Sequence, residues 1–273
     1  MKIGYLGPKG SFSEEALLAT LKYKEKELVP FPTIGDLITA CDKGKVNKAL
    51  VPVENSIEGS VNITLDTLVF NSSLVIEKEI VNNINHNLIA KKGTKIGDIQ
   101  KVLSHPQASA QCQQFLTKNL PGVLIEAVNS TSEAVRLASE QDGHVAAIGT
   151  KLAAKLYGLK VLRTDIQDYK DNQTRFLLIG KSKSKRTGRD KTTIACFIYA
   201  DKPGSLLQIL QEFAYRNINL TKIQSRPTKK ALGQYYFWID MEGHISDELV
   251  ADVIKCLKCK LREVKVLGFY PRK

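Results

Sequence analysis

The chain has 273 residues, of which 43% are hydrophobic, and it carries a formal net charge of +12. This length is typical of about two domains, and the apolar fraction is ordinary for a globular protein. No apolar run approaches the ~18 residues that a membrane-spanning helix needs. The first residues, MKIGYLGPKGSF, lack the pattern of a secretory signal peptide, so we expect a cytoplasmic protein with no membrane partner.

The positive charge is concentrated beyond residue 180. Residues 1–180 hold 21 basic and 19 acidic residues, whereas residues 181–191 hold six and one, and residues 192–273 hold 13 and eight. No aromatic side chain interleaves with the charges of 181–191, as binding of single-stranded nucleic acid would favour. We therefore predict a solvated basic linker at 181–191 and no nucleic-acid partner.

The cysteines and histidines predict neither disulfides nor a metal site. Five cysteines are an odd number at scattered positions, unlike a disulfide framework. Cys256 and Cys259 form a lone C-x-x-C in a helix-like stretch, with no second pair or nearby histidine to complete a zinc site. The four histidines show no ligand spacing, so we expect no metal.

In residues 1–180, β-rich runs alternate with helical patterns, which favours a doubly wound α/β architecture with a parallel sheet. The first helix shows the S-x-x-E capping pattern and is predicted to run from Ser11 or Ser13 to about Lys22. Strands are predicted at 2–7, 27–31, 48–54, 74–81, 101–105, 124–128, 144–149, 160–164 and 175–180. Further helices are predicted at 33–43, 61–69, 107–118 and 130–139.

The C-terminal region follows a different rhythm. A strand at 192–200 precedes a helix at 203–217, and a hairpin follows that turns at 229–233. A second helix begins at Ser246 as its cap, and a last strand closes the region. The strands are predicted at 192–200, 219–227, 234–241 and 263–270, and the helices at 203–217 and 246–258. This βαββαβ order predicts a ferredoxin-like sandwich.

Two polar loops early in the chain suggest a ligand site. The loop 7–13, GPKGSFS, brings a glycine-rich turn to a helix N-terminus, where backbone N–H groups suit an anion, although a tight turn explains it equally well. The loop 52–60, PVENSIEGS, holds more amide, hydroxyl and carboxylate groups than one helix cap needs. It follows a strand, and ligands of open α/β sheets bind at that end. We predict a site there.

Two later loops add candidate residues. In SHPQA, at 104–108, Gln107 shares a predicted helix face with Gln111, and His105 is either a plain turn residue or catalytic. In DNQTRF, at 171–176, Arg175 can pair with a carboxylate in two parallel hydrogen bonds. Thr174 beside it can donate a hydrogen bond to a leaving hydroxyl.

Together these motifs resemble those of the prephenate dehydratases, in the right order and over essentially the whole chain. The segments that carry the resemblance are GYLGPKGSFSEEAL, VPVENSIEGSVNITLDTL, SHPQASAQC, AAIGTKLAAKLYGL and NQTRFLLIG. The C-terminal region resembles the ACT domain attached to these enzymes. Gly204-Ser205-Leu206 stands where the family usually has Gly-Ala-Leu, and Gln224-Ser225-Arg226-Pro227 where it has Glu-Ser-Arg-Pro.

The resemblance implies the fold class and the domain organisation. It implies an α/β chain in which residues 1–180 form a bilobed catalytic domain like the type II periplasmic binding proteins, with the second lobe at about 78–164. A linker at 181–191 and a ferredoxin-like ACT domain at 192–273 would follow. It also implies a homodimer or homotetramer. Because the first strand begins at Lys2, we expect no chorismate mutase domain, which many relatives carry.

The resemblance further implies the decarboxylative dehydration of prephenate to phenylpyruvate in L-phenylalanine biosynthesis, with no cofactor. Phenylalanine would be the feedback effector at the ACT domain, although Ser205 and Gln224 depart from the family pattern. The catalytic residues implied are Thr174, Arg175, Asn55, Ser56 and Glu54. The substrate-binding residues implied are Gln107, Ser11, Phe176, Gly59 and Ser60. The effector-binding residues implied are Gly204, Ser205, Leu206, Gln224, Ser225, Arg226 and Pro227.

Three other functions compete with this hypothesis. An arogenate dehydratase performs the same chemistry on the aminated substrate, and the motifs do not separate the two. A non-catalytic ligand sensor is a rival because bilobed α/β domains and ACT domains both serve as sensors. The intact Thr174-Arg175-Phe176 run argues against a sensor, since a pure binder need not help a hydroxyl to leave. A DNA-binding regulator is the weakest, because no helix-turn-helix or zinc motif appears.

Overall fold

The structure is a computed structural model that describes residues 1–20, 27–230 and 233–272. It divides the chain into two compact units. The first contains Met1–Leu37, Leu50–Val61 and Val81–Phe176, and the second contains Ile38–Ala49, Asn62–Ile80 and Leu177–Lys273. No helix among the described residues is long and apolar enough to cross a membrane.

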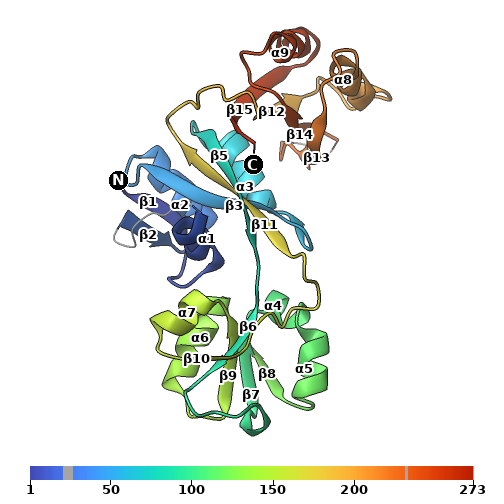
Figure 1. Cartoon of the computed structure of the whole chain (residues 1–273). Helices are drawn as coiled ribbons and strands as arrows, with labels where there is room; N and C mark the ends of the chain where they lie inside the picture. Colours follow the sequence, from blue (N-terminus) through green and yellow to red (C-terminus); the bar gives the residue numbers. More distant parts are fainter. Residues whose placement is uncertain (21–26, 231–232, 273) are drawn as a thin grey trace. The chain divides into compact units, whose positions relative to one another are not determined.

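The first unit contains a mixed five-stranded sheet, labelled in Figure 1. Strand β7 pairs in parallel with β8 and β9, whereas β6 is antiparallel to both β9 and β10. The prediction of a parallel sheet was therefore wrong here. It rested on the alternation of strands with helices, and β6, which the sequence did not predict, follows β5 without a helix between them. The order is β10 (Lys160–Arg163), β6 (Asn87–Ala90), β9 (Val145–Gly149), β7 (Lys101–Ser104) and β8 (Leu124–Ala127).

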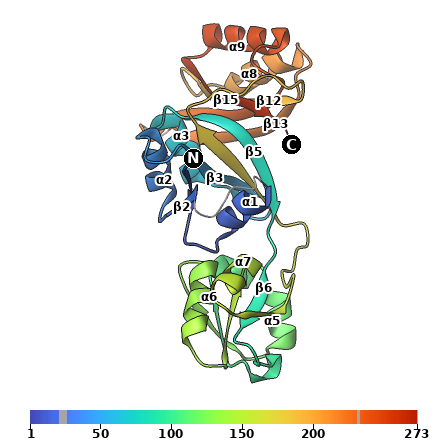
Figure 2. The same ribbon diagram turned by 60° about the vertical axis from the view of Figure 1, so that its left-hand side comes forward.

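Helices cover both faces of this sheet because its strands are apolar on both faces. Leu88 and Val102 pack in one buried cluster, under α4 and α5, while their neighbours Ile89 and Leu103 pack in another, under α6 and α7. Figures 1 and 2 both show α6 and α5 on opposite sides of the strands. The helices are α4 (Pro106–Ala110), α5 (Gln113–Asn119), α6 (Thr131–Glu140) and α7 (Lys151–Leu156), and η2 (Ile96–Asp98) is a short 3₁₀ turn.

The rest of the first unit is built on strand order β5-β11-β3-β1-β2. Strands β1 and β2 pair in parallel, and the short β4 turns back onto β3. The end predicted for the first helix, about Lys22, lies outside the described residues. The elements are β1 (Ile3–Leu6), α1 (Phe12–Thr20), β2 (Leu28–Phe31), α2 (Ile34–Asp42), β3 (Lys48–Asn55), β4 (Gly59–Ser60), β5 (Val75–Asn83) and β11 (Gln173–Gly180).

The second unit contains the predicted βαββαβ order, which is confirmed. Its strand order is β13-β14-β12-β15, followed by the unit's portions of β5, β11 and β3. Helices α8 and α9 cover one face of β12–β15, with Ile209, Phe213, Ile239 and Val253 in the core between them. The elements are α3 (Asn62–Phe70), β12 (Asp190–Phe197), α8 (Ser205–Ala214), β13 (Leu220–Pro227), β14 (Tyr235–Glu242), α9 (Glu248–Lys260) and β15 (Glu263–Pro271).

Two helix predictions need correction. The helix predicted at 107–118 is two helices, because the chain breaks at Gln111 and Cys112, whose side chains both turn into the interior. The last helix is capped by Asp247 and not by Ser246. The Ser246 N–H instead donates to Nδ1 of His244, which holds Ser246 in the preceding turn.

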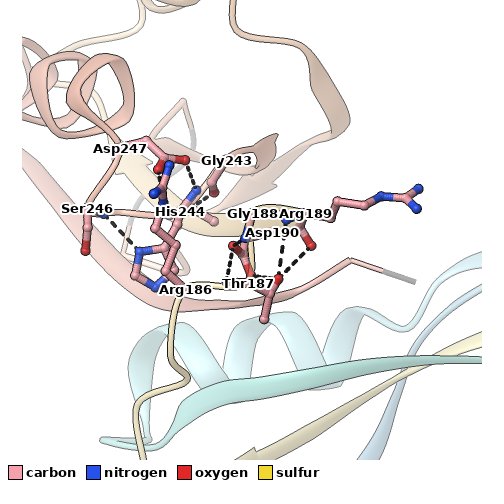
Figure 3. A network of polar contacts seen from close by, with 10 residues as sticks. Arg186, Thr187, Gly188, Arg189, Asp190, Gly243, His244, Ser246 and Asp247 are labelled. Atoms are coloured by element: carbon pink, nitrogen blue, oxygen red, sulfur yellow. Dashed lines mark hydrogen bonds and ion pairs between the residues drawn. The ribbon is translucent and has the colours of Figure 1, made fainter.

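Most of the predicted linker is exposed to solvent, but its last residues are anchored by hydrogen bonds and by strand pairing. Strand β12 already begins at Asp190, whose buried carboxylate accepts hydrogen bonds from Thr187 and Gly188. Burial alone would raise the pKa of Asp190, but these bonds outweigh it and lower that pKa. The Arg186 guanidinium pairs with Asp247, with 2.6 Å between Nε and Oδ1. Figure 3 shows both residues beside the turn of Thr187 to Asp190. The last two residues of the charged segment 181–191 are therefore part of β12, which lies between β14 and β15 in the sheet.

Candidate active site

A cavity of about 500 Å³ lies in the first unit, where the loops after β1, β3 and β7 meet the start of β11. Five of the predicted site residues line it: Ser11, Asn55, Gln107, Thr174 and Phe176. His105, which the sequence left as a turn or catalytic residue, lines it too. Hence segments far apart in sequence, each following or opening a strand, bring their polar side chains to one place.

Thr174 is positioned by the alternation of β11. Because successive side chains of a strand point to opposite faces, Thr174 and Phe176 face the cavity and Arg175 does not. Thr174 is only 9% exposed, and its Oγ1 accepts a hydrogen bond of 2.9 Å from Nδ2 of Asn55. No described residue accepts the Thr174 hydroxyl proton. That proton is therefore available to a molecule in the cavity.

Both the oxygen and the nitrogen of the Asn55 side-chain amide make hydrogen bonds that fix its orientation. Its Oδ1 accepts the backbone N–H groups of Ile57 (2.9 Å) and Glu58 (3.0 Å), which closes the turn after β3. Its Nδ2 donates to Thr174 and, at 2.8 Å, to Oδ1 of Asn172. Since backbone N–H groups can only donate, they settle which end of the amide is the oxygen. Asn55 therefore presents a donor to Thr174.

A row of amides continues from Asn55 to a carboxylate. Asn172 donates through Nδ2 to Oε1 of Gln111 at 2.9 Å, and Gln111 donates through Nε2 to Oε1 of Glu58 at 3.0 Å. An ionised carboxylate can only accept, so Glu58 fixes the orientation of Gln111 and, through it, that of Asn172. The network holds the Thr174 hydroxyl in one position before any ligand arrives.

His86 joins this network at Gln111 and also lines the cavity. Its side chain is 3% exposed, and Nε2 lies 3.1 Å from Oε1 of Gln111. That oxygen is an acceptor, so Nε2 carries the hydrogen and Nδ1 presents a lone pair. Burial lowers the pKa of His86, against the opposing effect of the Gln111 hydrogen bond. Nδ1 is a buried acceptor without a partner among the described residues.

The other residues predicted from the loop 52–60 and from β11 lie outside the cavity lining. Glu54 and Arg175 form an ion pair with 3.8 Å between Oε2 and Nη1. Ser56 links the two segments, since its Oγ accepts the N–H of Gln173 at 2.9 Å and donates to the Asp171 carbonyl at 3.3 Å. Gly59 and Ser60 are β4, paired with Asn55 and Glu54. These residues hold the loop that presents Asn55.

The loop 7–13 is a tight turn, and its Ser11 also lines the cavity. It is a tight turn, because Gly10 has a φ of +84° and a Cβ there would lie 2.9 Å from Cβ of Ala153. Thr150 also donates to the Gly10 carbonyl at 2.6 Å. Ser11 follows at the start of α1, donates to the Leu6 carbonyl at 2.9 Å and lines the cavity. The turn thus brings the N-terminus of α1 to the cavity wall.

The predicted effector residues lie in the second unit, at one end of its sheet. Strands β12 and β13 both run antiparallel to β14, so their carboxyl ends meet at the same edge. Gly204 caps α8 with a φ of +86°, Ser205 donates to the Ala200 carbonyl at 3.2 Å, and Leu206 is exposed. In the segment Gln224–Pro227, which ends β13, Arg226 is paired with Asp66.

The sequence did not select His86 or Asn172 as site residues, and it named Gln111 only as a neighbour of Gln107. Asn172 carried a usable signal, because it lies two residues before Thr174 and faces the same way along an extended chain. His86 carried no such signal. It is a single polar residue beside a four-residue strand, and only the three-dimensional contact with Gln111 distinguishes it.

Two family models match the chain. The model of prephenate dehydratase matches residues 3–184, and the model of the ACT domain matches residues 192–257. Curated relatives include a prephenate dehydratase of Methanocaldococcus jannaschii, 42% identical over 98% of this chain and 97% of that one. Another, of Bacillus subtilis, is 37% identical over 99% of this chain and 98% of that one.

Among solved structures, a prephenate dehydratase from Arthrobacter aurescens in complex with L-Phe has the same fold. It superposes with a TM-score of 0.93 at 36% sequence identity, and the match covers all of this chain and 90% of that one. The α/β fold class with a C-terminal ACT domain is thereby confirmed.

Proposed function

The chain belongs to the prephenate dehydratase family, and we propose that it converts prephenate to phenylpyruvate, carbon dioxide and water in the cavity of the first unit. One observation carries the proposal beyond family membership. The cavity holds a hydroxyl, that of Thr174, whose lone pair is engaged by Asn55 and whose proton is unused by the described residues. A hydroxyl held in this way can donate to an oxygen that is leaving.

The reaction needs help at one oxygen and needs no electron acceptor. The bond from the ring to its carboxylate breaks and releases carbon dioxide. Its electron pair moves through the ring and expels the ring hydroxyl, which leaves as water after taking up one proton. The ring becomes aromatic, which supplies the driving force. Stabilising the departing oxygen by a hydrogen bond or by proton donation therefore lowers the main barrier.

Thr174 is the donor that we assign to the leaving hydroxyl. Its O–H is far too weak an acid for complete transfer at neutral pH, so it acts by hydrogen bonding or by relaying a proton from water. Asn55, oriented through Asn172, Gln111 and Glu58, fixes the direction of that donation. Such preorganisation avoids rearranging the donor during the reaction.

The electrostatics of the cavity suit loss of the ring carboxylate. The described residues that line it include no Asp, Glu, Lys or Arg. The N-termini of α1, at Ser11 to Ser13, and of α6, at Ser130 and Thr131, open onto it and favour anions. A substrate carboxylate is thus held without a full counter-charge, and decarboxylation relieves its poor solvation.

The remaining site residues have supporting roles in this proposal. Gln107 donates to the substrate, Ser11 forms part of the cavity wall at the N-terminus of α1, and Phe176 packs against the substrate ring. Ser56, Gly59 and Ser60 hold the loop that carries Asn55. Arg175 remains the candidate partner of a substrate carboxylate, and it must leave Glu54 to reach one.

We also infer that phenylalanine regulates the enzyme at the ACT domain, through Gly204–Leu206 and Gln224–Pro227. Support comes from the match to a relative solved in complex with L-Phe. The assembly we propose is a cytoplasmic homodimer or homotetramer formed partly through ACT domains. Leu207 and Ile223 are apolar and exposed on α8 and on the edge strand β13, as such an interface would need. Sedimentation of the purified chain, with and without phenylalanine, measures this assembly.

Turnover of prephenate by the purified chain, read as phenylpyruvate absorbance in base, tests the proposed activity. We expect a rate far above the slow spontaneous reaction and suppression by phenylalanine. Arogenate serves as the matched substrate, since it carries an amino group in place of the keto oxygen of the side chain. Its product is phenylalanine, so its turnover is read by chromatography of that amino acid. Faster turnover of arogenate would assign the chain to the aminated substrate, and no turnover of either would overturn the dehydratase function.

A further inference from the structure

Helix α3 is the part of the second unit that follows the candidate site in the chain. It begins at Asn62, directly after the loop that carries Asn55 and ends in β4. That loop is closed at its base, because the Val61 N–H donates to the Val53 carbonyl at 2.9 Å. The chain thus runs from the closed base of this loop straight into the first turn of α3.

Asp66, in the middle of α3, is held by the ACT strands. Its carboxylate accepts two hydrogen bonds from Arg226, at 3.1 and 2.8 Å, and one from the Tyr236 hydroxyl at 2.9 Å. Lys229 pairs with it at 2.7 Å. The Asp66 side chain is only 5% exposed. Burial alone would raise the pKa of Asp66, but these donors outweigh burial and lower it.

The C-terminal end of α3 is held by a second cation. The Lys265 ammonium donates to the carbonyls of Leu68, Val69 and Ser72 at 3.1, 2.7 and 3.0 Å. The last carbonyls of a helix have no partner within the helix, and they attract positive charge. Burial lowers the pKa of Lys265, and the negative charges of Glu263 and Asp42 oppose that shift.

Aromatic packing completes the contact. Phe70 of α3 lies edge-on to Tyr236, with ring centroids 5.4 Å apart, and to Phe197 at 6.0 Å. Tyr236 alternates along β14 with Phe237 and Ile239, which belong to the core under α8 and α9. Helix α3 therefore lies on the face of β12–β15 that α8 and α9 leave open.

We propose that Asp66 is a positioning residue for catalysis, which ties the loop bearing Asn55 to the ACT strand that ends in Gln224–Pro227. The inference rests on the proposed function. Arg226 has a special place in it, because its two donors toward Asp66 are the same donors that an amino-acid carboxylate would use. An effector carboxylate that takes these donors breaks both hydrogen bonds from Arg226 to Asp66, so effector binding weakens the contact that holds α3.

Asp66→Asn keeps the volume of the side chain and removes the charge that holds Arg226. We expect kcat for prephenate to fall about tenfold while KM changes less than about twofold. We also expect phenylalanine to bind more tightly by calorimetry, because Arg226 no longer has to leave a carboxylate, and to inhibit the remaining activity less. The double variant Asp66→Arg with Arg226→Asp should recover part of kcat.

The matched control is Asp252→Asn, which breaks the Arg216–Asp252 pair of the ACT domain at 2.7 Å and does not touch α3. It should leave kcat and phenylalanine response unchanged. If Asp66→Asn does not fold, as judged by its melting transition, Arg226→Lys tests the same tie while keeping the charge. A folded Asp66→Asn or Arg226→Lys variant with wild-type kcat and wild-type phenylalanine response would overturn this inference and leave the proposed function standing. A wild-type chain without turnover would remove the proposed function and the inference together.

Discussion

Two buried polar clusters, one around Thr174 and one around Asp66, differ in how many of their hydrogen-bonding groups have partners. Around Thr174, in the first unit, the groups are neutral amides, a hydroxyl and an imidazole, and two of them have capacity to spare: the Thr174 proton and Nδ1 of His86. Around Asp66, in the second unit, full charges meet, and the carboxylate accepts from Arg226, Tyr236 and Lys229.

Buried polar groups in folded proteins nearly always have partners, so the spare capacity of the first cluster calls for a ligand. The Asp66 carboxylate of the second cluster already has several donors and needs no ligand. Its contacts hold α3 against the ACT strands. In the proposed function, the cluster with the weaker charges meets the substrate, and the cluster with full charges holds α3 against the ACT strands.

The largest effect is expected from Thr174→Ala. Loss of the donor should lower kcat by roughly 10²–10⁴, the usual range for one such catalytic group. Stability should change little, because the lost hydroxyl mainly accepts one hydrogen bond, from Asn55. Thr174→Ser, which keeps the hydroxyl, is the control and should retain most of kcat. Single-turnover kinetics with prephenate measures both variants, and near wild-type turnover by Thr174→Ala would remove this residue from the mechanism.

Removing the charge of Asp66 should appear in stability as well as in turnover, and it should depend on pH. The pKa of Asp66 is lowered in the folded state, so its stabilisation is complete above the ordinary carboxyl pKa and is lost as the pH falls below about 4. At pH 7 we expect Asp66→Asn to unfold with a free energy about 3 kcal/mol smaller than that of the wild type. Urea unfolding at pH 7 and at pH 3 checks this.

The wild type and Asp66→Asn should approach each other in stability as the pH falls, because protonation of the wild-type carboxyl removes the same charge that the substitution removes. Asp252→Asn provides the reference for an exposed carboxylate of the same unit, since Asp252 is 53% exposed. A constant difference between wild type and Asp66→Asn at both pH values would mean that the charge of Asp66 contributes nothing to holding α3.

Asn172→Leu tests the amide row without touching a residue that meets the leaving group. The change leaves Nδ2 of Asn55 and Oε1 of Gln111 each without one partner. A buried polar group that loses its partner costs about 1–3 kcal/mol. We expect kcat to fall about 10- to 50-fold because Asn55 is free to turn away from Thr174. Steady-state kinetics and thermal unfolding, measured on the same sample, separate this loss of orientation from simple destabilisation.

Most of the correct predictions came from local sequence patterns, in which neighbouring residues specify a strand or a helix. The strands of 48–55 and 173–180 are apolar runs, and the β-rich runs and periodic helices of 190–271 specify the βαββαβ order locally. Strand β6 was missed because it has four residues and begins with a buried asparagine, Asn87. Its direction, which makes the sheet mixed, depends on pairing with β9 and β10, and no local pattern encodes that.

The same limit applies to the site. Thr174 and Asn55 were predicted through sequence motifs, yet the hydrogen bond between them spans 119 residues and is visible only in the structure. Asp66 lies within a predicted helix and looked like any exposed helical carboxylate. Its partner Arg226 follows 160 residues later, in a motif that the sequence assigned to effector binding. Distant pairs of this kind depend on tertiary packing, which periodicity does not report.

The smallest effect is expected at an exposed ion pair, and it sharpens the contrast with Asp66. Arg136 and Glu140 pair at 2.7 Å on one face of α6, with side chains 42% and 56% exposed. Exposed pairs four residues apart in a helix contribute about 0.3–0.5 kcal/mol, because water screens them and ordering two long side chains costs entropy. Glu140→Gln should therefore change the unfolding free energy by no more than about 0.5 kcal/mol and leave kcat unchanged.

A salt series to about 1 M should remove even that difference, whereas the difference between wild type and Asp66→Asn should persist because buried pairs are screened far less. If both differences vanished in salt alike, the Asp66 cluster would be an ordinary surface pair, and α3 would owe its place to the aromatic contacts of Phe70 instead.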